Sequence, residues 1–92
     1  MRFDFDPSKS QQLRENPRRG IGFEEATKIF DRPYYQDQRS DFPEQYRAIG
    51  WVGDQLYSLI FEVREDKEGE FYHLITLWKC TREEREIYAD NS

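Results

Sequence analysis

The chain has 92 residues, a length that favours one domain, residues 1–92, with a single modest core. Hydrophobic and charged residues each make up 36% and the mean hydropathy is −1.07, but aromatic residues reach 16%, well above the level of disordered chains. The net charge of −5 argues against tight, non-specific nucleic-acid binding, and no apolar run approaches the roughly 18 residues of a membrane span. Because no signal-peptide pattern is present either, we expect a cytoplasmic protein.

The N-terminal third of the sequence predicts a strand followed by two helices. The alternation of apolar and acidic residues in RFDFD favours a half-buried strand over residues 2–6. Asp6 is a good N-cap for a helix over residues 7–15, which begins with proline. After the loop NPRRGIG, the apolar spacing of FEEATKIFD predicts a second helix over residues 23–31.

The middle of the sequence predicts a β-meander. Residues 34–43 favour a weak strand and then a polar loop. Stronger strands are predicted at 45–52, 55–63 and 71–80, with a tight hairpin at Gly53-Asp54 and a charged turn over residues 64–70. The last of these strands is apolar on both faces, which indicates a central position in the sheet.

The C-terminal element is predicted to be a helix over residues 82–89. Thr81 and Glu84 have the spacing of a capping box, in which each side chain accepts a hydrogen bond from the other residue's amide. The order of elements therefore predicts an α+β fold, a small antiparallel sheet with helices packed on one face.

Cys80 is the only cysteine, which excludes an internal disulfide and a metal site built from several cysteines. The only histidine, His73, lies seven residues earlier in the same predicted strand. An odd spacing places the two side chains on opposite faces, so we expect a buried thiol rather than a Cys–His nucleophile. We expect no metal and no cofactor.

Four motifs occur in the order of a known bacterial family. They are DPSK (6–9), GIGFEEATKIFDRP (20–33), RAIG (47–50) and LITLWKCTREEREIY (74–88). Each motif is short, but together they span most of the chain, from residue 6 to residue 88, and the ordered set resembles the BrnT family of toxins. These toxins are the ribonuclease halves of BrnT–BrnA toxin–antitoxin pairs.

The resemblance implies a RelE-like fold, with a sheet that carries helices on one face and an RNA-cleaving surface on the other. Such enzymes cleave RNA without a metal ion by attack of a 2′-hydroxyl on the adjacent phosphate. This chemistry needs cations placed where negative charge develops, and a proton donor for the leaving oxygen. The implied partners are an RNA substrate and a cognate BrnA-like antitoxin of the ribbon-helix-helix type, in a toxin–antitoxin hetero-oligomer.

Seven residues are candidates for the implied site. The catalytic candidates are Arg47, Arg64, His73 and Lys79, and the RNA-binding candidates are Arg18, Arg19 and Trp78. The arginines and the lysine could bind phosphate, while the histidine is a candidate general acid or base. Each also has a structural interpretation: a solvated strand-end cation, a packed aromatic residue or a structural histidine.

The main departure from the family pattern is Trp78, which stands where the family usually has arginine. Tryptophan cannot neutralise a phosphate, although it could stack on a base. The next residue, Lys79, is a cation, but neighbouring strand residues point to opposite faces of a sheet, so it cannot directly replace the arginine. Arg19 stands where the family has histidine and cannot transfer a proton near neutral pH.

Two functional interpretations follow. In the first, the chain is a BrnT-like endoribonuclease toxin that inhibits translation until its antitoxin neutralises it. In the second, it is a catalytically degenerate relative whose sheet face only binds a protein partner. The order of the motifs favours the first, while the acidity and the tryptophan favour the second.

Overall fold

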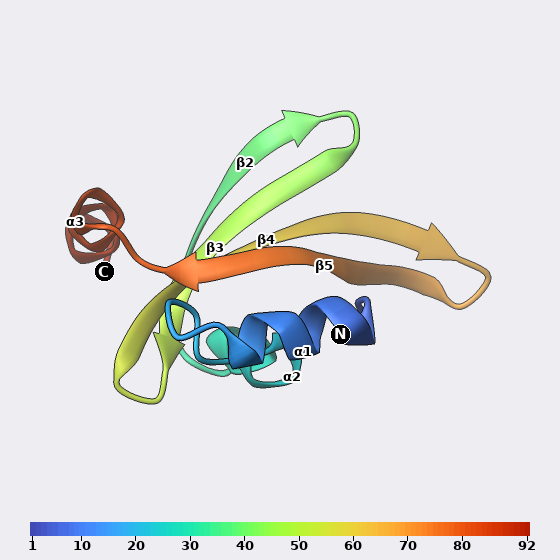
Figure 1. Cartoon of the computed structure of the whole chain (residues 1–92). Helices are drawn as coiled ribbons and strands as arrows, with labels where there is room; N and C mark the ends of the chain where they lie inside the picture. The colour runs from blue at the N-terminus through green and yellow to red at the C-terminus, as the bar shows by residue number, and fades with distance from the viewer.

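The computed structural model describes all residues from 1 to 92. It is an α+β fold whose elements run in the order β1 (Arg2–Asp4), α1 (Pro7–Glu15), α2 (Phe23–Ala26), η1 (Thr27–Asp31), β2 (Tyr35–Asp41), β3 (Glu44–Val52), β4 (Gln55–Asp66), β5 (Gly69–Lys79) and α3 (Arg82–Asp90) (Figure 1). No helix of the chain has the length and apolar character needed to cross a membrane.

The five strands form one mixed sheet in the order β1-β5-β4-β3-β2. Strands β2 to β5 are an antiparallel meander, and β1 lies parallel to β5. The sequence predicted a purely antiparallel sheet, and this prediction is wrong. The N-terminal strand β1 pairs in parallel with the last strand, β5, rather than joining the meander. The predicted central position of β5 is confirmed, since it lies between β1 and β4.

The first face of the sheet carries the main hydrophobic core. Side chains of α1, α2 and η1 pack on the first-face residues of β3, β4 and β5. The cluster consists of Leu13, Phe23, Ala26, Ile29, Ala48, Tyr57, Leu59, Phe61, Leu74 and Leu77. The two N-terminal helices lie together against this face (Figure 1). Burial of so many large apolar side chains supplies most of the driving force for folding.

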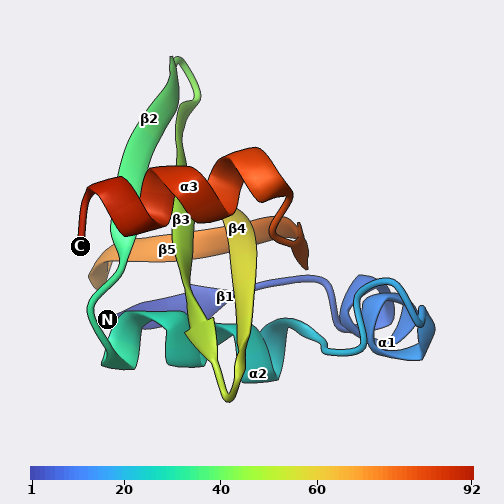
Figure 2. The ribbon, with the colours of Figure 1, turned by 90° about the vertical axis from the view of Figure 1, so that its left-hand side faces the viewer.

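The second face carries a smaller core at one end, beneath α3. Ile49, Leu56 and Cys80 form a buried cluster against which Ile87 and Tyr88 of the helix pack. Figure 2 shows α3 crossing this face, while α2 lies at the opposite side of the strands. The prediction of helices on one face only is therefore wrong.

Local sequence signals explain the helix starts. The Asp6 carboxylate accepts a hydrogen bond from the Ser8 amide at 2.9 Å, as expected of an N-cap. The predicted capping box of α3 is also confirmed, with Thr81 and Glu84 bonded reciprocally. The predicted helix over residues 23–31 is instead one α-helical turn followed by a 3₁₀-helix.

The β2–β3 and β4–β5 hairpins are longer than predicted. Residues 35–41 form a full edge strand, β2, and the charged turn between β4 and β5 contains only Lys67 and Glu68. Both hairpin tips project from the body of the molecule, away from α3, and diverge from each other (Figure 1). The end of the second face that lies toward the β4–β5 tip is therefore free of helices.

Candidate functional site

The structure divides the predicted site residues between the two faces of the sheet. Arg47, Arg64, His73 and Trp78 lie on the second face, reached from three adjacent strands. Lys79 pairs with Tyr57 of the main core, which places it on the first face. The expectation that Trp78 and Lys79 point in opposite directions is therefore confirmed.

Arg47 is held between two carboxylates. Its Nε and Nη2 donate to Asp37 of the neighbouring strand at 3.0 and 2.5 Å, and its Nη1 lies 3.4 Å from Glu84 of α3. The hydrogen bond to Asp37, together with both negative charges, raises the pKa of the guanidinium despite its partial burial. Arg47 thus neutralises its own surroundings rather than facing a ligand.

Trp78 belongs to the same network. Its indole Nε1 donates to Glu84 Oε1 at 2.9 Å, whereas Arg47 contacts the other oxygen, Oε2. The Glu84 side chain is only 6% exposed, so a buried charge is compensated by the arginine, the indole and the Thr81 amide. We infer that the tryptophan fixes the last helix rather than stacking on a base.

The pKa of Glu84 reflects this balance. Burial raises the pKa of the carboxyl, but the hydrogen bonds from Thr81 and Trp78 and the charge of Arg47 outweigh burial. The pKa is therefore lowered from its ordinary value of 4.5, and the carboxyl stays ionised inside the fold. The residue serves both as a helix cap and as the centre of the network.

A second cluster lies further along the same face, on the part without a helix. His73 of β5 pairs directly with Glu62 of β4, and its Nδ1 lies 2.8 Å from the Asp4 carboxylate of β1. Arg64, two residues beyond Glu62, donates to Glu62 Oε1 through Nε at 3.0 Å and Nη2 at 2.7 Å. Two basic and two acidic side chains from three strands therefore meet here.

These four side chains differ in exposure in a way that suits a surface site. Glu62 is 13% exposed and His73 22%, while Arg64 and Asp4 are about half exposed at 48% and 58%. An open hollow of about 480 Å³ adjoins the cluster, lined by Arg2, Phe3, Asp4, Asp66 and Phe71. A polymer could approach this end of the sheet without displacing a helix.

Cys80 and His73 lie on the same face, contrary to the expectation from their odd spacing. The β4–β5 register shifts between Ile60 and Phe61, so that Thr76 pairs with Ile60 but Leu74 pairs with Phe61. This bulge inserts one residue and reverses the alternation. The two side chains still cannot act together, because Cys80 lies under α3 and His73 lies beside Glu62, about 20 Å along β4 at 3.3 Å per residue.

The RNA-binding candidates of the α1–α2 loop lie away from both clusters. Arg19 Nε donates to the Leu77 carbonyl at 3.0 Å, and the Arg19 carbonyl accepts from the Tyr57 hydroxyl at 2.8 Å. These bonds tie the loop to the end of the sheet on the first face. Arg18 and Lys79 are exposed, and neither side chain forms a hydrogen bond within the chain.

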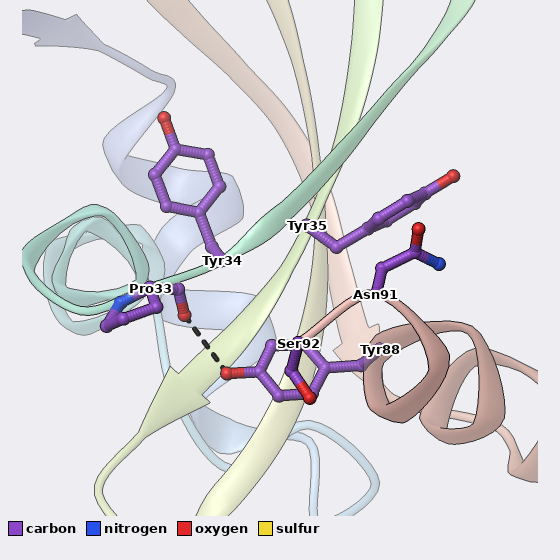
Figure 3. A pocket seen from close by; sticks show the side chains of 6 residues that line it. All are labelled: Pro33, Tyr34, Tyr35, Tyr88, Asn91 and Ser92. Atoms are coloured by element: carbon purple, nitrogen blue, oxygen red, sulfur yellow. Dashed lines mark hydrogen bonds between the residues drawn. The ribbon is translucent and has the colours of Figure 1, made fainter.

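A small hollow of about 40 Å³ lies where the end of α3 meets the start of β2, lined by Pro33, Tyr34, Tyr35, Tyr88, Asn91 and Ser92 (Figure 3). The Tyr88 hydroxyl points to the Pro33 carbonyl and donates to it at 3.1 Å. Tyr88 also packs its ring against Trp51. This hollow is a docking contact of the C-terminal helix, and it gathers no charged side chain.

Sequence reasoning missed the four carboxylates that accompany the predicted cations: Asp4, Asp37, Glu62 and Glu84. Two of them carried a local signal: Glu84 through its capping-box spacing from Thr81, and Glu62 as the one charged residue on the second face of the strand over 55–63. Asp4 and Asp37 come from β1 and β2, and the contacts of Glu84 with Arg47 and Trp78 depend on the docking of α3, so these pairings follow only from the tertiary fold. No group of three or more acidic, histidine or cysteine side chains is arranged to hold a metal ion.

No protein-family model matches the chain, and comparison with curated proteins finds no similar sequence.

Proposed function

We propose that this chain is an endoribonuclease toxin of the kind its motifs resemble, with a RelE-like fold in which the C-terminal helix α3 also covers one end of the RNA-facing side of the sheet. In this proposal it cleaves RNA in the cytoplasm without a metal ion, inhibits translation, and is neutralised by a cognate antitoxin. The observation that carries the proposal is the cluster on the second face. A guanidinium, Arg64, and an imidazole, His73, lie on paired strands of a surface that no helix covers.

This pairing matches what cleavage by a 2′-hydroxyl requires. The reaction builds negative charge on the phosphate oxygens, which a guanidinium stabilises, and it releases an alkoxide that must gain a proton. Arg64 and His73 can meet these two needs with their own side chains. Arg47 takes a supporting part, because Asp37 and Glu84 already occupy its hydrogen-bond donors.

A second candidate function has one specific observation in its favour. Each predicted cation of the second face has a carboxylate partner: Asp37 and Glu84 for Arg47, Glu62 for Arg64, and Asp4 for His73. Such neutralisation weakens attraction for a polyanion. A non-catalytic protein that only binds a partner through this face would show the same pairing.

A cleavage assay separates the two candidates. Purified chain, free of partner, is incubated in EDTA with cellular RNA and, separately, with translating ribosomes. Under the toxin proposal, cleavage occurs in at least one of these reactions and leaves 2′,3′-cyclic phosphate ends. We expect Arg64→Gln to slow cleavage by about 100-fold or more, as loss of one charge-stabilising donor does.

The matched control is Arg82→Gln, because Arg82 is 87% exposed and pairs only with Glu86 of its own helix. This variant is expected to cleave at the original rate. Intact RNA in both reactions, from a chain whose circular dichroism shows a folded α+β protein, would favour the protein-binding function.

A further inference from the structure

We propose that Glu62 and His73 act as a general base and general acid pair, with Asp4 as the positioning residue for the histidine. The inference rests on the proposed ribonuclease function and assigns the proton transfers within it. The substrate phosphodiester would lie over the β4–β5 pair, with Arg64 on its non-bridging oxygens.

The register of the sheet brings the acid and the base together. His73 and Glu62 are direct cross-strand partners on the same face, and such partners have Cβ atoms about 4.5–5.5 Å apart. Arg64 is on the same face of β4, two residues from Glu62. The two groups that move protons and the group that stabilises charge are thus fixed on rigid, paired strands.

The hydrogen bonds of Glu62, Arg64 and His73 do not occupy the atoms that the reaction needs. Both bonds from Arg64 go to Glu62 Oε1, while Oε2 accepts only a 3.3 Å bond from Gln45. Arg64 Nη1 and His73 Nε2 have no hydrogen-bond partner in the chain. A base oxygen, a donor for phosphate and an acid nitrogen therefore remain available side by side.

Asp4 gives the histidine its orientation. Its carboxylate lies 2.8 Å from Nδ1 and accepts the Nδ1–H, which orients the ring. In the imidazolium that the acid role requires, both nitrogens carry a proton, and the Nε2–H is then the one to be donated. Asp4 comes from β1, which pairs with β5 over only three residues. A contact to a carboxylate that is 58% exposed adds little to stability, so orientation is the larger effect of the contact.

The proton balance of the step is complete. Glu62 takes the proton of the 2′-hydroxyl as the O2′–P bond forms, and His73 gives its Nε2 proton to the 5′ oxygen as the P–O5′ bond breaks. The products are a 2′,3′-cyclic phosphate and a 5′-hydroxyl. Exchange with water then returns the proton from the glutamic acid and reprotonates the imidazole.

The decisive test uses a substrate whose leaving group needs no acid. A cut site is first mapped in a test RNA, and the same RNA is then made with sulfur in place of the 5′ bridging oxygen at that site. For the oxygen substrate we expect His73→Gln and Glu62→Gln each to slow cleavage by about 100- to 10,000-fold, the usual contribution of general acid–base groups. Asp4→Asn should cause a smaller loss.

For the sulfur substrate, a thiolate leaves without protonation. We therefore expect the losses in His73→Gln and Asp4→Asn to disappear, and the loss in Glu62→Gln to persist. A merely structural role for the Asp4–His73 pair would lower both rates equally. Glu65→Gln is the matched control for the base, because Glu65 is an exposed carboxylate of the same strand without a hydrogen bond of its side chain.

The outcomes distinguish the inference from the function on which it rests. Cleavage by the original chain that persists at full rate in Glu62→Gln and His73→Gln would overturn the inference and leave the ribonuclease function standing. Losses in His73→Gln that sulfur fails to restore would remove the acid assignment. Absence of cleavage by the original chain, on free RNA and on translating ribosomes, would overturn both.

Discussion

At the scale of single residues, two arginines of this sheet differ in role: one compensates charges within the fold, and the other is available to a ligand. Arg47 is 20% exposed and bridges two carboxylates, one of them buried, whereas Arg64 is 48% exposed and holds one carboxylate with two of its donors. Burial decides the difference, because a buried charge must be compensated within the fold. The first arginine is therefore tied to stability, and the second is free enough to serve a ligand.

The buried carboxylate makes a prediction about acid stability. The pKa of Glu84 is lowered in the folded chain, so its ionised form contributes stability above the ordinary value of 4.5, and that contribution is lost as the pH falls through the folded pKa. We expect Glu84→Gln to reduce the free energy of unfolding at about pH 6, and the difference from the original chain to shrink toward about pH 3. Urea unfolding at each pH measures it.

The control for this experiment is Asp90→Asn, which removes an exposed carboxylate at the end of the same helix. It should follow the acid unfolding of the original chain. A constant difference between Glu84→Gln and the original chain across the whole range would show that the carboxyl does not titrate with unfolding.

At the scale of elements, α3 is the least anchored part of the core. It rests on a cluster of three buried residues, whereas the N-terminal helices share a cluster of ten. Its attachment depends on Ile87 and Tyr88, on the Arg47–Glu84 contact, and on its N-cap. We therefore expect α3 to detach before the rest of the domain unfolds.

Cys80 reports this detachment. Its thiol is 5% exposed beneath α3, and burial raises its pKa, so a thiol reagent reacts only when the helix opens. Thr81→Ala removes the N-cap, which costs about 1 kcal/mol, so we expect labelling of Cys80 under native conditions to become about five times faster. Labelling with a thiol reagent, followed by mass spectrometry, measures the rate.

Asp6→Ala removes the N-cap of α1 on the other face and serves as the control. It should leave the labelling rate nearly unchanged if α3 opens by itself. Equal acceleration in both variants would mean that the thiol is exposed only by global unfolding.

Particular residues show how much of the fold and of the candidate site could be predicted from the sequence. The caps at Asp6 and Thr81, and the interior position of β5, followed from local patterns and are confirmed. The parallel pairing of β1 and the placement of α3 did not, because pairing and docking join residues far apart in the sequence. The bulge near Thr76 also escaped prediction, since strict alternation gives no sign of an inserted residue.

At the scale of the whole molecule, the net charge of −5 is accompanied by paired cations on the candidate surface. RNA binding by this chain should therefore depend on few phosphate contacts. The expected contact is Arg64, supported by His73, rather than a broad basic patch.

The salt dependence of RNA binding tests this expectation. For single-stranded RNA, the logarithm of the binding constant falls with the logarithm of salt concentration by about 0.7 for each phosphate neutralised. One or two contacts give a slope near −1, and Arg64→Gln should make it shallower. Fluorescence anisotropy with the mapped substrate gives the slope, and a value of about −4 or steeper would reveal a basic surface elsewhere on the molecule.

The sequence by itself determined the local properties of this protein: its α+β class, most strand and helix positions, both helix caps, and the order of motifs that resembles BrnT toxins. The tertiary structure decided which residues share a surface. It paired β1 with β5, which brought Asp4 to His73, and it placed α3 over one end of the second face, which enclosed Arg47 and Trp78. The physical reason is that periodicity fixes the direction of a side chain within its own element, whereas burial and charge compensation between elements set its partners.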